Sequence, residues 1–66
     1  MELSEEEEIL IILSKELGIE TGLIVGTILT LRQQPQAAMD EMIVYIADNK
    51  PTQEEYLTKL TTLVSA

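Results

Sequence analysis

Carboxylates are the side chains of this sequence with the greatest potential for chemistry. The chain holds twelve Asp and Glu residues and neither His nor Cys. Acids adjoin one another at Glu5–Glu8, at Asp40 and Glu41, and at Glu54 and Glu55. Their oxygens suit a hard cation such as Ca²⁺, but an EF-hand loop alternates oxygen ligands around a central Gly, and no such run occurs here. We therefore expect no metal site and no cofactor.

Catalysis would depend on the same carboxylates, on a Lys or on a Tyr, because the usual His and Cys are absent. Such groups become useful acids or bases in a pocket that shifts their pKa values. A helical chain of 66 residues has little room for such a pocket. We expect that the protein is not an enzyme.

The length predicts a single small helical domain over residues 1–66. A chain of this size buries only roughly 60% of the surface that its unfolded form exposes, so its stability is marginal. Small domains often gain stability from disulfides, from zinc or from a partner chain, and the lack of Cys and His removes the first two. The composition thus favours association with another chain.

The net charge of −8 restricts the classes of partner. Binding to a phosphate backbone or to anionic lipid depends on clustered Lys or Arg, and the four basic residues of this chain are scattered. We expect neither nucleic acid nor a membrane as partner. Seven of the acids lie in residues 1–20, where a signal peptide would carry basic residues, and this predicts a cytoplasmic protein.

Two capping boxes predict where the first and the last helix begin. In Ser4–Glu7 and in Thr52–Glu55, a hydroxyl residue precedes Glu by three positions, so each side chain can bond the other residue's backbone N–H. The first helix is expected to run to about Glu16 or Leu17. It should stop at Gly18, because glycine adopts the left-handed conformation at little cost.

The two middle helices have weaker signals at their ends. Thr21 is the expected N-cap of a second helix that ends near Arg32, whose charge complements the helix dipole. Pro35 suits the first turn of a third helix that runs to about Asp48. Asn49 is expected to adopt the left-handed cap after it, ahead of the next proline.

Apolar residues at helical spacing predict the buried faces of these segments. The residues expected on buried stripes are Ile9, Leu10, Leu13, Leu17, Ala38, Met39, Met42, Ile43, Tyr45, Ile46, Tyr56, Leu57, Leu60, Leu63 and Val64. The pattern predicts an all-α fold of four short helices in a compact bundle, either orthogonal or irregular.

The segment Leu23–Leu31 contains no charged residue, and it must be buried on most of its circumference by its own chain or by another. A strand here would find no segment of period two to pair with, so a helix is favoured. Small residues spaced by four, Gly22, Gly26 and Thr30, predict a strip along which another helix packs closely.

The corner between the first two helices resembles a helix-turn-helix in its spacing. Within Leu13–Ile19 the small residue Ser14 stands four positions before Gly18, with apolar residues around it. A recognition helix would expose Arg, Lys, Asn or Gln toward bases and phosphates, whereas Thr21–Leu31 offers only Thr. We expect a helix-turn-helix-like corner that packs without contacting DNA.

Several apolar residues have no place in the core of one chain. They are Ile11 and Val44 on outer faces, Ile12 at the edge of its buried stripe, and Val25 and Leu29 as surplus apolar residues of the second helix. If they gather on one side, they form a patch of several hundred Å², which in a soluble protein usually marks a contact site. The most common solution is a two-fold homodimer in which the patch meets itself.

These expectations favour a small acidic protein-protein interaction module that self-associates, in which another protein is a further possible partner. One alternative is a transcription regulator of the helix-turn-helix type. Another is an acidic inhibitor or antitoxin that imitates nucleic acid with Glu5–Glu8. Retention of duplex DNA near physiological salt would favour the regulator, and salt-dependent binding to a basic protein would favour the mimic.

Overall fold

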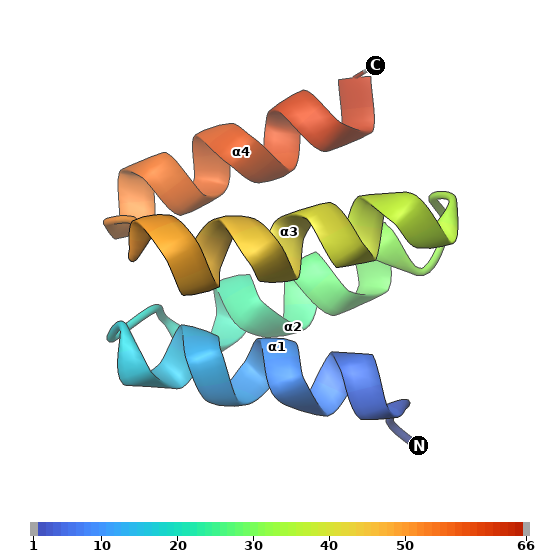
Figure 1. Ribbon diagram of the computed structural model, residues 1–66, viewed down its shortest axis with the longest axis horizontal. Coiled ribbons are helices and arrows are strands. Elements are labelled where there is room, and N and C mark those ends of the chain that lie inside the picture. Colours follow the sequence, from blue (N-terminus) through green and yellow to red (C-terminus); the bar gives the residue numbers. More distant parts are fainter. Residues whose placement is uncertain (1, 66) are drawn as a thin grey trace.

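The structure, a computed structural model, describes residues 2–65, which form four helices. They are α1 (Glu5–Glu16), α2 (Thr21–Leu31), α3 (Gln36–Asn49) and α4 (Gln53–Ser65). Consecutive helices run in opposite directions, and no strand occurs among the described residues (Figure 1). The all-α prediction with four helices is confirmed.

Each outer helix, α1 or α4, contacts both middle helices, α2 and α3. α1 packs along α3 and also contacts α2, and α4 contacts the same two helices from the other side of α3 (Figure 1). Among the described residues, the buried hydrophobic core comes from every helix and from the first corner. Its residues are Leu10, Ile19, Ile24, Ile28, Leu31, Met39, Met42, Ile46, Tyr56 and Leu60.

Both capping boxes form as predicted. The Ser4 hydroxyl accepts from the backbone N–H of Glu7 at 3.2 Å, and the Glu7 carboxylate accepts from the backbone N–H of Ser4 at 2.9 Å. At α4, Thr52 and Glu55 make the same reciprocal pair at 3.3 and 2.9 Å. These local signals determine where the two outer helices begin.

The start of α2 differs from the prediction. Thr21 is the first helical residue, and Glu20 is the N-cap, with extended backbone angles of φ −61° and ψ 137°. Glu20 makes no capping hydrogen bond with its own side chain, but its backbone N–H donates to Oε1 of Gln53 at 2.9 Å. The helix therefore begins one residue earlier than expected, and a side chain of α4 bonds the backbone of its N-cap.

The end of α3 also differs from the prediction. Asn49 remains helical, and its side-chain amide donates to the carbonyl of Tyr45 at 3.1 Å. Lys50 takes the left-handed conformation at φ 46°, one position after the residue that was expected to adopt it. At the other end Pro35 is the N-cap rather than a residue of the first turn. Gly18, at φ 79°, follows the C-cap of α1 in the left-handed conformation, so the first helix stops there as predicted.

The predicted stripes of the outer helices were too wide. Ile9, Leu57 and Val64 are exposed, although their spacing placed them with the core. Ile11, assigned to an outer face, is half-buried against the core. α1 and α4 each contact α2 and α3, and Ile9, Leu57 and Val64 lie at the edges of their stripes, where they reach the surface.

Candidate functional site

A groove lies on the surface between α1 and α2. Its volume is about 330 Å³, and Ile24 and Ile28, which belong to the core, are part of its lining. The other apolar lining residues are Leu3, Ile11, Val25 and Leu29, and its polar lining residues are Lys15 and Thr21. Three of the five residues predicted for an interface, Ile11, Val25 and Leu29, therefore come together at one groove.

The other two predicted interface residues do not line this groove. Ile12 is on α1 and Val44 is on α3, and both are more than half exposed. Helical wheels identified both as surface residues but gave no information on which helices lie side by side. The structure therefore separates the α1/α2 groove from Ile12 and Val44.

The small residues of α2 lie outside the packed interior. A Cβ atom added to Gly26 would meet nothing within 4 Å, and one added to Gly22 would meet only the Glu20 side chain at 3.4 Å. Thr30 is partly exposed. Close packing of another helix of the same chain on this strip was therefore a wrong expectation, since α1, α3 and α4 contact other sides of α2. Close approach of a second chain stays a prediction.

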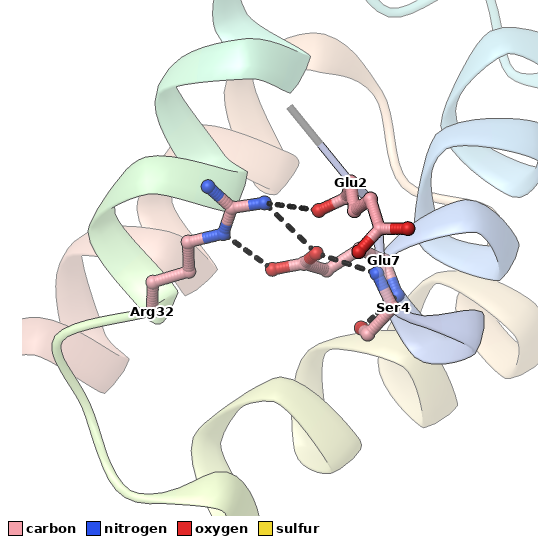
Figure 2. Close-up of polar contacts among 4 residues, drawn as sticks. All are labelled: Glu2, Ser4, Glu7 and Arg32. Carbon is pink, nitrogen blue, oxygen red and sulfur yellow. Dashed lines mark hydrogen bonds and ion pairs between the residues drawn. The ribbon is translucent and has the colours of Figure 1, made fainter.

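An ion pair joins the beginning of α1 to the end of α2 (Figure 2). Arg32 donates through Nε to Oε2 of Glu7 at 2.6 Å and through Nη2 to Oε1 at 3.0 Å. Arg32 Nη2 also reaches the backbone carbonyl of Glu2 at 3.5 Å, beside Leu3 of the groove. These bonds thus fix the positions of residues 2–4, α1 and α2 relative to one another around the groove.

Sequence reasoning missed this ion pair, since it assigned Arg32 only to the helix dipole. A signal was present in the spacing. Glu7, Leu10 and Ser14 stand at i, i+3 and i+7, so they share one face of α1, and all three are buried. A carboxylate on a buried face needs a charged or hydrogen-bonding partner.

The ion pair alters the acidity of both groups. Hydrogen bonds from the Arg32 side chain and then from the Ser4 backbone lower the pKa of Glu7 from 4.5 to about 2. Glu7 in turn raises the pKa of Arg32. At the neighbouring position a hydrogen bond with Asp40 raises the pKa of Glu6, so the pKa values of the two adjacent carboxyls shift in opposite directions.

Glu7→Gln is expected to remove a part of the pH dependence of folding. The Glu7 carboxylate binds its proton more weakly in the folded chain than in the unfolded chain, so its stabilisation is complete above the unfolded pKa and is lost as the pH falls toward 2. The difference in urea midpoint between the natural chain and Glu7→Gln should shrink between roughly pH 5 and pH 2. A constant difference across this range would contradict the assignment, and Glu8→Gln controls for the loss of one exposed charge.

The described residues contain no cluster of three acids able to hold a metal ion. Within residues 2–65, no helix combines the length and the apolar character that crossing a bilayer requires. The outward side of α2 carries Thr, Gly, Val and Leu, which are not the side chains that read base edges.

Comparison with known proteins gives no relative from which a role could be transferred. Neither a protein-family model, nor a curated protein, nor a solved structure matches this chain.

Proposed function

We propose that the protein is a small, acidic, non-catalytic interaction module that self-associates through the α1/α2 groove and the neighbouring surface of α2. The observation that supports this proposal best is the convergence of Leu3, Ile11, Val25 and Leu29 around one groove. A cytoplasmic location is part of the proposal, because a chain without Cys gains nothing from an oxidising compartment.

The energetic reason for a partner is the apolar area that remains in contact with water. Leu3, Val25 and Leu29 are each exposed by more than a third, and they adjoin one another at the groove. Isolated apolar residues on a surface need no explanation, but a contiguous patch is typical of a contact site. Burying such area is favourable by roughly 25 cal/mol per Å² before the costs of association.

The charge distribution favours a second copy over a highly charged partner. α2 has no charged residue along its whole length, whereas the chain carries a net charge of −8. Two copies can bring their α2 surfaces together without placing the acidic side chains of one copy against those of the other. A basic protein or a nucleic acid would gain little from this surface, because Lys15 is the one charged residue that lines it among residues 2–65.

Val25→Glu is expected to convert the associated protein into a monomer, because a carboxylate buried at an apolar contact without a partner is strongly unfavourable. Val44→Glu is the matched control. It makes the same substitution at an equally accessible valine on α3, with exposed fractions of 49% for Val25 and 57% for Val44. Sedimentation equilibrium of the natural chain and both variants should show association in the natural chain and in Val44→Glu only.

A natural chain that stays monomeric at about 100 µM, which corresponds to an association free energy weaker than roughly −5.5 kcal/mol, would overturn the proposal. So would equal dissociation by the two variants, since the groove would then have no special role. Association should tighten as salt is added, because screening reduces the repulsion between two acidic chains.

A further inference from the structure

We infer that two copies of this chain pack their α2 helices against each other in antiparallel order, with a two-fold axis at Gly26. This inference rests on the proposed self-association and specifies its geometry. Gly26 is the midpoint of α2, which runs from Thr21 to Leu31. A two-fold contact is self-complementary, so each residue must suit the residue equally far from the axis on the other copy.

The sizes of the side chains along α2 meet this requirement. Gly22 and Thr30 lie four positions before and after Gly26, so an antiparallel partner places the Gly22 of each copy opposite the Thr30 of the other. All three residues share one side of the helix, because positions four apart are neighbours on a helix surface. Small side chains along such a line allow two helix backbones to approach closely.

The surroundings of Gly26 leave this approach open. Nothing in the chain comes within 4 Å of the position that a Cβ atom would occupy there. Beside the strip, the groove provides exposed Val25 and Leu29, which can pack against a helix lying over α2. The strip supplies the closest approach, and the groove side chains supply most of the buried apolar area.

Charge favours the antiparallel order over the parallel one. The residues that flank α2 are Glu20 and Arg32, each six positions from Gly26. An antiparallel partner keeps the Glu20 of one copy away from the Glu20 of the other, and it also aligns opposite ends of the helix dipoles. A parallel partner would bring Glu20 toward Glu20. Arg32 stays paired with Glu7, so the preference comes from the Glu20 carboxylates and the helix dipoles.

Cysteine cross-linking tests this geometry directly, because the natural chain contains no Cys. A disulfide requires Cα atoms about 4.4–6.8 Å apart, which adjacent positions at a close helix crossing satisfy. With copper-phenanthroline as oxidant, Gly26→Cys should form covalent dimers. A mixture of Gly22→Cys and Thr30→Cys should cross-link far more than either variant alone. Val44→Cys, on the outside of α3, is the control for random collision.

A second variant tests the same contact without introducing a cysteine, whose side chain would itself alter the packing. Gly26→Ala should raise the melting temperature of the dilute monomer, because Ala favours helix over Gly and the space is open. The same added methyl group should weaken association by about tenfold or more, because it separates the two backbones.

The outcomes separate this geometry from the proposed function. Cross-linking of the mixed pair together with weaker association of Gly26→Ala would support the antiparallel contact. Efficient cross-linking of Gly22→Cys alone would indicate parallel helices and overturn it. Association that is unchanged in Gly26→Ala and lost in Val25→Glu would also overturn it, while leaving self-association through the groove intact. A monomeric natural chain would overturn both.

Discussion

Leu10→Ala is expected to unfold much of the protein at room temperature. Leu10 is 0% exposed on the face of α1 that meets the core, and truncating a buried Leu costs about 2–5 kcal/mol. A domain of this size has a total stability of only roughly 3–10 kcal/mol, so this loss removes a large share of it. Urea titration followed by far-UV circular dichroism should show a much lower midpoint, or no folded baseline.

Ile12→Ala is the matched control, because it removes an aliphatic side chain two positions away on the same helix. Ile12 is 58% exposed, and surface substitutions usually change stability by no more than about 0.5 kcal/mol. Both variants should be measured on dilute protein, where association contributes little. Equal losses of stability in the two variants would mean that α1 does not pack on the face described.

The second large effect is expected at the hydroxyl pair in the core. Ser14 Oγ and Tyr56 Oη lie 3.0 Å apart, and both residues are 0% exposed. Tyr56→Phe leaves the Ser14 hydroxyl without this partner, and Ser14→Ala does the same to Tyr56. An unsatisfied buried polar group costs about 1–3 kcal/mol, so each single variant should be clearly destabilised.

The double variant distinguishes this pair from two independent packing effects. Once both hydroxyl groups are gone, no buried donor or acceptor is left unpaired, so the loss in the double variant should be smaller than the sum of the single losses. The coupling energy from urea midpoints should be at least about 0.5 kcal/mol. Strict additivity would show that each hydroxyl has an adequate alternative partner.

The elements that sequence predicted well depend on neighbouring residues. Ser4 with Glu7, and Thr52 with Glu55, are three positions apart, and Gly18 ends its helix by its own conformational freedom. A capping box or a glycine stop therefore forms in much the same way whatever the rest of the fold looks like.

The contacts that sequence missed join residues far apart in the chain. Arg32 meets Glu7 across 25 positions, and Tyr56 meets Ser14 across 42. Ser14 was read only as a small residue in a tight corner, although its hydroxyl has a partner on α4. Helical periodicity gives the direction in which a side chain leaves its helix, but the neighbouring helix in that direction is known only once the helices are packed.

The same limit explains why the residues predicted for the interface do not all lie together, while the interface itself stays a prediction. The wheels correctly placed Ile12, Val25, Leu29 and Val44 on the surface, where all four are exposed. They could not show that Val25 and Leu29 share a groove with Ile11 while Val44 lies on another helix. That grouping depends on α1 lying beside α2, which no local pattern encodes.

The Glu7 carboxylate has a consequence for how the molecule opens. It accepts from the Ser4 backbone at the first turn of α1 and from Arg32 just beyond the last turn of α2. Fraying of the first turn of α1 therefore also removes the Glu7–Arg32 contact from the end of α2. Likewise, the last turn of α2 cannot open without breaking this contact. In native-state hydrogen exchange, the amides of these two helix ends should report one joint opening event rather than two separate ones.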